Sequence, residues 1–285
     1  MAVVFALLAL VGWGTGDIFV TKASRKFGDK NTYFWWLIFS GVIASLYIPF
    51  AGYPSDFFMF FIALIMCFFG AVGSLLYFKA LQIGHSSLIG TISGAFASIT
   101  VPLSIIFFGE TITLFQGLYI LLIIAGIIIA SLNFSEFRTR SLKKMLSAPG
   151  VDIAFLVMVI WGIYWAFIRI PVESIGWFWA GYPGYLFFLV MIVLGMIKRN
   201  VFSVVQKKST VFLFLIMSVF TTVAGFSYNL GITYGYTSIV APIAGASPVL
   251  FVILTRFVFR EPLRRSQTVG ILLSLTGILL LSFSG

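Results

Sequence analysis

One acidic side chain of this sequence lies where a carboxylate is costly. Among 285 residues there are 8 Asp and Glu, and Asp17 is the one well inside a long apolar stretch, residues 3–21. If that stretch is a membrane helix, an ionised Asp near its centre costs ~2.5–3.5 kcal/mol, so Asp17 must be paired, hydrated or protonated. Two alternatives follow. Asp17 either pairs with Lys22, Lys79 or another cation at that end, or serves a cavity as a proton site or an ammonium contact.

Aromatic and small polar residues recur at helical spacing elsewhere in the chain. Trp13 precedes Asp17 by one turn, and Trp161 precedes Trp165 by the same interval. Two further helical faces combine small and polar residues: Gly70, Gly73, Ser74 and Tyr77, and then Thr221, Ala224, Gly225 and Tyr228, with Asn229 beside the second face. Such faces give a cavity room and wettable walls, although Tyr and Trp can also simply bond across helices. We predict that the substrate-binding residues are Trp13, Asp17, Ser74, Tyr77, Trp161, Trp165, Tyr228 and Asn229.

The inventory of reactive groups argues against an enzyme. The chain has one histidine, His85, and one cysteine, Cys67, and no apolar stretch holds two acids or a His with an acid. Hydrolytic triads, HExxH sites and metal cages need such clusters, so we expect no catalytic residue, no metal site and no cofactor. The sequence also lacks the GxxxxGK[ST] motif, so a gradient of substrate or ion, and not ATP, must drive any transport.

The composition indicates an all-α integral membrane protein. Hydrophobic residues make up 61% of the chain and charged residues 9%, where soluble domains carry about 25%. Apolar stretches of about 20 residues predict transmembrane helices, in which every backbone group is bonded within the segment. Ten such stretches are present: 3–21, 33–50, 57–81, 88–108, 114–132, 153–170, 177–197, 211–234, 238–259 and 267–283.

The basic residues predict the orientation. With ten spans, 17 of the 18 Lys and Arg fall on one side and Arg169 alone on the other, which makes the first side cytoplasmic. Both termini are then extracytoplasmic, in the cell (cytoplasmic or inner) membrane. The net charge of +10 is a topology signal, and we expect no nucleic-acid partner. Tyr33, Trp35 and Trp36 are interpreted as an aromatic belt at the cytoplasmic interface, and Trp177 and Trp179 as the outer belt.

The second half of the sequence repeats polar positions of the first. Glu110 and Gln116 are matched by Glu261 and Gln267, and Tyr77 by Tyr228, each 151 residues later. Trp13-Gly14 is matched by Trp161-Gly162 at an offset of 148. Each copy holds five spans, and an odd number inverts the second copy in the membrane. We predict two inverted five-helix repeats, residues 1–133 and 151–285, joined by a basic cytoplasmic linker, residues 134–150. Such repeats are typical of secondary transporters that work by alternating access.

This arrangement resembles the drug/metabolite transporter superfamily, specifically its EamA-type permeases. The resemblance covers the whole chain and lies in the WG pair of each half, the following Tyr, and the GE or RE followed by Gln at each last hairpin. It implies transport of a small metabolite, an amino acid or a related compound, with export the expected direction. Proton-coupled uptake is the alternative, and a channel the third possibility. The expected partners are the substrate, the lipid bilayer and, in the proton-coupled alternative, protons, with the chain a monomer or a weak homodimer.

Overall fold

The computed structural model describes residues 1–131, 148–197, 201–259 and 265–284, and every regular element in these ranges is helical. The first half contains α1 (Ala2–Phe27), α2 (Asp29–Ser45), α3 (Ile48–Ala51), α4 (Phe57–Ile83), α5 (Ser86–Gly94), α6 (Ala97–Phe108) and α7 (Leu114–Ser131). The second contains α10 (Val151–Phe167), α11 (Arg169–Gly181), η1 (Tyr182–Leu186), α12 (Phe187–Val193), η2 (Val201–Val205), α13 (Lys208–Tyr234), α14 (Thr237–Gly245), α15 (Ser247–Phe259) and α16 (Arg265–Phe283).

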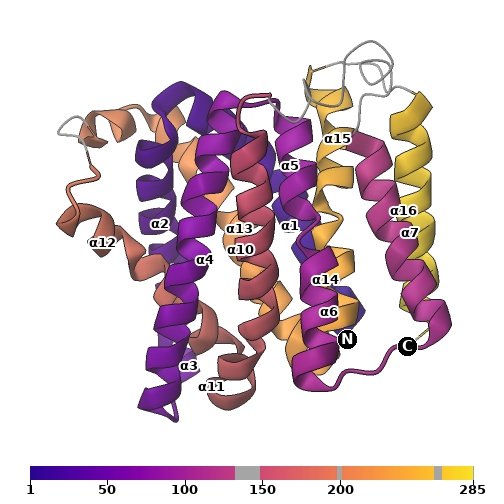
Figure 1. Cartoon of the computed structure of the whole chain (residues 1–285). Coiled ribbons are helices and arrows are strands. Elements are labelled where there is room, and N and C mark those ends of the chain that lie inside the picture. The colour runs from indigo at the N-terminus through magenta and orange to yellow at the C-terminus, as the bar shows by residue number, and fades with distance from the viewer. Residues whose placement is uncertain (132–147, 198–200, 260–264, 285) are drawn as a thin grey trace.

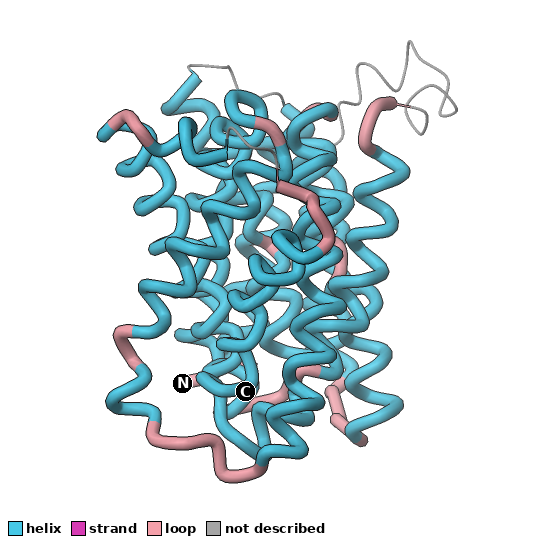
Figure 2. The backbone as a smooth tube through the Cα atoms, turned by 90° about the vertical axis from the view of Figure 1, so that its left-hand side faces the viewer, coloured by secondary structure: helices cyan, strands magenta, loops and turns pink. Residues whose placement is uncertain are grey.

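The helices form one bundle with both chain termini at the same end (Figure 1). We call this end the terminal end. A view turned by 90° shows that the long helices run along a common axis and that most connections lie at the two ends of the bundle (Figure 2). In Figure 1, α1 runs away from the terminal end, whereas α10, which begins the second half, runs toward it.

Seven helical segments of the described residues are long and apolar enough to cross a membrane. They are Ala2–Phe27, Phe57–Ile83, Ser86–Phe108, Arg169–Val193, Lys208–Tyr234, Thr237–Leu254 and Arg265–Phe283, and two shorter apolar helices are Leu114–Ala130 and Val151–Phe167. Helices also cover the predicted stretch 33–50, as α2 and α3. The chain is therefore built from apolar helices, as the composition predicts.

Three predicted stretches are interrupted helices. The stretch 88–108 is divided between α5 and α6, and 238–259 between α14 and α15. The stretch 177–197 begins after a bend at Gly176, where φ is 82°, and passes through the 3-10 turn η1 before α12. A positive φ suits glycine, which has no Cβ to clash with the carbonyl. Hydropathy is continuous through the first two breaks, so the sequence pattern alone does not reveal them.

The two halves meet closely where α5 and α14 end. A Cβ on Gly94 would lie 2.6 Å from Cγ of Pro248, and a Cβ on Gly245 would lie 2.9 Å from the carbonyl oxygen of Gly94. Glycine at both positions therefore lets the two interrupted helices touch through their backbones. Around this contact, α1 packs along α13 and α4 packs along α10, and these four helices carry most of the site described next.

Candidate functional site

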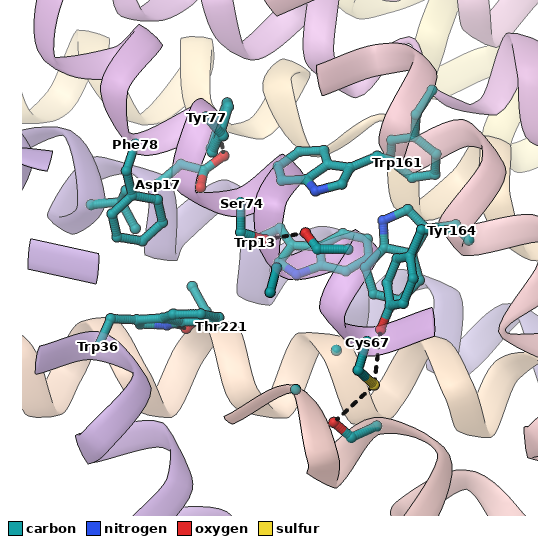
Figure 3. Close-up of a pocket in the computed structure, with 18 of the residues that line it drawn as sticks. Trp13, Asp17, Trp36, Cys67, Ser74, Tyr77, Phe78, Trp161, Tyr164 and Thr221 are labelled. Atoms are coloured by element: carbon teal, nitrogen blue, oxygen red, sulfur yellow. Dashed lines mark hydrogen bonds between the residues drawn. The ribbon is translucent and has the colours of Figure 1, made fainter. Parts of the chain in front are cut away.

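A cavity lies between the two halves, near the middle of α1, α4, α10 and α13. About 140 Å³ of it is open to the centres of water-sized molecules. At the ~30 Å³ that a water molecule occupies in the liquid, that is room for roughly five waters, the scale of a small metabolite. Figure 3 shows Asp17 beside Tyr77, Trp36 beside Thr221, and Cys67 beside Tyr164 around the same space. The polar and aromatic lining residues are Trp13, Asp17, Tyr33, Trp36, Cys67, Ser74, Tyr77, Phe78, Phe96, Trp161, Tyr164, Trp165, Tyr185, Thr221, Phe226, Asn229 and Ser247.

Asp17 is held by a hydroxyl group and not by a cation. The Tyr77 hydroxyl of α4 donates to Oδ2 of Asp17 at 2.7 Å. Among the described residues, no ion pair forms between Asp17 and Lys22 or Lys79, and both lysines are exposed. The first alternative drawn from the sequence, an ion pair of Asp17 with Lys22 or Lys79, is therefore absent among the described residues.

Small residues on α4 bring the aromatic side chains of α10 into the cavity. A Cβ on Gly70 would lie 2.8 Å from the Tyr164 ring, and a Cβ on Gly73 would lie 2.8 Å from Cδ1 of Trp161. The glycines therefore leave space that these rings fill. The Tyr77 ring packs against Trp161 with 4.8 Å between centroids. The helical face of small residues predicted from sequence thus positions aromatic groups of the other half.

A second aromatic group forms the adjoining wall. Trp165 lies 5.1 Å from Trp13, 4.6 Å from Tyr164 and 4.5 Å from Tyr228, measured between ring centroids. Tilted and edge-to-face contacts at these distances suit the quadrupoles of the rings. The wall is therefore packed on its outer side and presents aromatic surface to the cavity.

Asn229 contributes an acceptor that lacks a partner. Its Nδ2 donates to the Trp177 carbonyl at 3.0 Å, which fixes which end of the amide is oxygen. Its Oδ1 is buried and has no hydrogen-bond partner among the described residues. The residue lines the cavity and is 2% exposed. A buried acceptor without a donor is costly to the fold.

A different carboxylate joins the two halves at the terminal end. Glu110, in the connection between α6 and α7, is 3% exposed and forms an ion pair with Arg169 of α11. It also accepts hydrogen bonds from the backbone N–H groups of Thr237 and Ser238, each at 2.7 Å. These N–H groups begin α14, and a carboxylate is favoured there by the helix dipole. We call this set of four residues the Glu110 junction.

The repeat partner of Glu110 is Glu261, which lies outside the described residues. The sequence repeat relates Glu110 and Gln116 to residues of the second half but does not indicate what they contact. Gln116 donates from Nε2 to the Ser284 carbonyl at 3.1 Å and accepts at Oε1 from the backbone N–H of Thr113. The repeated polar residues of the first half therefore organise the terminal end of the bundle.

Comparison with known proteins gives the family. A model of the EamA-like transporter family matches residues 1–132 and again residues 148–283. The chain belongs to the EamA-like transporter family. Members of this family are membrane transporters of small molecules, so the predicted membership in the drug/metabolite transporter superfamily is confirmed. The family and the apolar helices together identify a multi-pass membrane protein.

Two relatives of this EamA-family chain add to the picture. An uncharacterized protein of Methanocaldococcus jannaschii is 35% identical over 138 residues, which are 46% of this chain and 97% of that protein. A protein of known crystal structure has the same fold, with a TM-score of 0.75 at 17% identity, covering 100% of this chain and 99% of the other. The first similarity shows that a protein about half as long matches about half of this transporter.

Seven of the eight predicted binding residues line the cavity of this EamA-family protein: Trp13, Asp17, Ser74, Tyr77, Trp161, Trp165 and Asn229. Tyr228 does not. It is fully buried behind the wall, and its hydroxyl donates to the Trp165 carbonyl at 3.0 Å. The repeat makes Tyr228 the counterpart of Tyr77, but the two side chains lie in different surroundings. Whether the seven residues bind substrate remains a proposal.

The interpretation of Tyr33 and Trp36 as an interfacial belt is wrong. Tyr33 is fully buried, its hydroxyl donates to the Ala71 carbonyl at 3.0 Å, and both rings line the cavity. The Trp36 indole N–H donates to Oγ1 of Thr221 at 2.7 Å. Aromatic residues near a helix end suit either an interface or a cavity, so their type could not decide. Their i, i+3 spacing was the available signal, since it places both rings on one helical face.

Proposed function

We propose that this protein is a secondary transporter that moves a small metabolite, an amino acid or a related compound, across the cell membrane by alternating access. Export is the proposed direction, and the transport is facilitative or driven by a gradient. The observation that carries the proposal is a cavity of metabolite size walled by both halves of the chain. A site between two halves can be exposed to either side in turn when the halves rock against each other.

Reciprocal contacts support ten spans arranged as two inverted repeats. A Cβ on Gly14 would lie 2.8 Å from the Ser247 carbonyl oxygen and 2.9 Å from Cβ of Leu250. Gly162, the counterpart of Gly14, meets the counterparts of those two residues: its Cβ would lie 3.2 Å from the Phe96 oxygen and 2.6 Å from Cβ of Ile99. Each half therefore contacts the other through equivalent residues, as expected for a pseudo-twofold axis.

The family comparison supports the same division of the chain. The same family model matches two segments, 1–132 and 148–283. The boundaries lie close to the proposed repeats, 1–133 and 151–285, and leave the basic segment 134–150 mostly between them. A relative that is only about as long as one half also favours duplication of a shorter unit.

The Glu110 junction supports a two-state mechanism because it joins the two halves at the terminal end of the cavity. Glu110 belongs to the first half, whereas Arg169, Thr237 and Ser238 belong to the second. Opening the terminal end requires that these bonds break. We propose that the structure is the state closed at the terminal end and that the junction re-forms in each cycle.

The distribution of basic residues supports an orientation with both termini extracytoplasmic. Arg169 is the only basic residue assigned to the terminal end from the sequence. A reporter fused to the C-terminus should read extracytoplasmic, and one inserted at residue 140 should read cytoplasmic. The opposite pattern contradicts this orientation. We propose that the chain acts as a monomer or a weak homodimer, which the mass of the protein in lipid nanodiscs will measure.

The test begins with thermal-shift screening of the purified protein against metabolite pools, followed by counterflow in proteoliposomes with the compounds that stabilise it. Trp161→Ala should reduce counterflow at matched protein amounts, because it removes a large part of the cavity wall. The control is Phe155→Ala on the same helix, whose side chain is 41% exposed on the outside of the bundle. Equal counterflow of Trp161→Ala and wild type contradicts the assignment of the cavity.

Proton-coupled uptake is the second candidate function, and Asp17 favours it. A carboxylate at this depth that lacks a bonded cation can bind and release a proton during the cycle. A channel is the third candidate, and the walls of the cavity argue against it, because channels use rings of like residues around a shared axis. Uptake rates that are unaffected by a pH gradient would exclude the second candidate.

A further inference from the structure

The charged side chains of the cavity are of one sign, negative. Among the described residues that line it, Asp17 is the sole acid, and there is no Lys, Arg or His. Opposite charges are paired when they are buried, because an isolated ion loses its hydration. An anionic ligand would meet no positive side chain here and would approach a carboxylate. A cationic ligand would meet the one charge that the cavity offers.

Asp17 also has unused capacity to accept hydrogen bonds. A carboxylate has about four acceptor sites. Oδ2 of Asp17 accepts from the Tyr77 hydroxyl at 2.7 Å, and Oδ1 has no partner among the described residues. Tyr77 thus holds the carboxylate in place from one side and leaves the other oxygen to a ligand or to water.

A second acceptor lies on the opposite half. Asn229 lines the cavity, and its buried Oδ1 has no donor among the described residues, while Nδ2 donates to the Trp177 carbonyl. Asp17 belongs to α1 and Asn229 to α13. The two acceptors are too far apart for one ammonium group: Thr221, which lies against Gly16, and Asn229 are eight residues apart on α13, about 12 Å along its axis. An ammonium group therefore suits Asp17 alone.

The aromatic wall favours the same ligand charge. Trp13, Tyr77, Trp161 and Trp165 all line the same cavity as Asp17. The face of an aromatic ring attracts a cation, with Trp the strongest, and the attraction grows when the cation is desolvated. Indole N–H groups can donate to a carboxylate, but they are neutral and would not offset repulsion from Asp17. The chemistry of the rings and of the carboxylate therefore favours an organic cation.

We propose that the cavity recognises an organic amine with net positive charge, whose ammonium group lies between Asp17 and the aromatic rings. Zwitterions and anions bind less tightly, because their carboxylate has no cation to meet. This inference rests on the proposed transport function and names its substrate class. The proposed substrates are therefore not amino acids themselves. They are related amines that lack a free carboxylate.

Three probes with one ring and different charges test the proposal. Tyramine is a cation, tyrosine is a zwitterion, and 3-(4-hydroxyphenyl)propionate is an anion. Binding is measured calorimetrically on the full chain in lipid nanodiscs. Tyramine should bind at least about tenfold more tightly than the other two, a difference of about 1.4 kcal/mol. Asp17→Asn should remove this preference, and Asp17→Glu should retain it.

The matched control is Asp56→Asn. Asp56 lies outside the cavity, and its side chain accepts from the backbone N–H groups of Phe58 and Met59 at the start of α4. Asn caps a helix about as well as Asp, so the fold should be kept. Asp56→Asn should bind tyramine as the wild type does. Thermal unfolding of each variant with and without tyramine shows that the folded protein is being compared.

The outcomes separate this inference from the function beneath it. Tighter binding of tyrosine or of the propionate, a preference for tyramine that survives Asp17→Asn, or no binding of any probe overturns the inference. Transport of tyrosine in proteoliposomes without binding of tyramine overturns it too, while the transport function stands. Binding of tyramine that depends on Asp17, without tyramine movement across the membrane, supports the amine site and contradicts transport.

Discussion

Glu110 and Asp17 are two carboxylates within the same bundle, and their surroundings differ. Glu110 forms an ion pair with Arg169 and accepts two backbone N–H bonds, and it is 3% exposed. Asp17 accepts one bond from Tyr77 and faces a cavity. A fully bonded carboxylate stabilises one arrangement of the chain. A partly bonded one has capacity left for a ligand or a proton.

The difference predicts different consequences of mutation. Removing one partner of a buried ion pair leaves an uncompensated charge, which is costly to the fold. Neutralising Asp17 leaves no such charge behind, because no cation among the described residues pairs with it. We therefore expect variants of the Glu110 junction to change stability first, and variants around Asp17 to change binding and transport first.

The largest effect is expected for Glu110→Gln. The change leaves Arg169 paired only with the exposed Glu173 and should lower the free energy of unfolding by up to about 3–5 kcal/mol, as measured by denaturation in mixed micelles. The matched control is Glu173→Gln, because Glu173 also pairs with Arg169 but its side chain is 53% exposed. An exposed pair contributes little, so this variant should lose less than about 1 kcal/mol. Equal losses would remove the distinction between the two acids.

Asp17→Asn should alter transport more than stability. The substitution keeps the size of the side chain and its bond to Tyr77 but removes the charge and the ability to release a proton. Counterflow of a compound identified by screening should depend on pH in the wild type and lose that dependence in the variant. The same preparation is checked by thermal unfolding. Reduced stability with a wild-type pH profile would make Asp17 a structural residue.

Smaller effects are expected for the repeated tyrosines. Tyr77→Phe removes the hydroxyl that bonds Asp17, a loss of about 1 kcal/mol that should weaken tyramine binding roughly fivefold. Tyr228→Phe removes a bond to the Trp165 carbonyl and should lower stability by a similar amount without changing affinity. Calorimetry and thermal unfolding on both variants measure the contrast. Identical behaviour would mean that the repeat, and not the surroundings, decides their roles.

Much of the bundle and of the cavity was predictable because apolar length and helical spacing are local properties. The i, i+4 pair of Trp13 and Asp17 and the small-residue face ending at Tyr77 were visible in this way, and they do line the cavity. The family followed from the repeat of rare polar residues. These signals need no knowledge of how the helices pack.

The remaining features depend on packing and could not be read from local patterns. The breaks near Ala95 and Ala246 occur within continuous hydropathy. They accompany a contact between the neighbouring glycines of the two halves, which local patterns do not show. The prediction that Tyr33 lies at an interface is wrong because tyrosine suits both an interface and a buried site, and residue type does not distinguish them. The bonds of Glu110 to α14 join residues 127 and 128 positions apart, so no spacing rule indicates them.

Access to one residue of the cavity tests the central claim, that a site between the halves opens to each side in turn. Ser74 lines the cavity, so Ser74→Cys would place a reactive thiol there. The native thiol is removed by Cys67→Ala. The reagent is a membrane-impermeant methanethiosulfonate that carries a trimethylammonium group, applied to either face of sealed vesicles.

Alternating access predicts labelling from each face, slowed by a transported compound and accompanied by no ion leak. Adding Glu110→Gln should raise the rate from the face that carries the termini, because the Glu110 junction no longer holds that end closed. Two results would contradict the account. One is labelling from the same single face both in the absence and in the presence of Glu110→Gln. The other is labelling from both faces together with ion conduction.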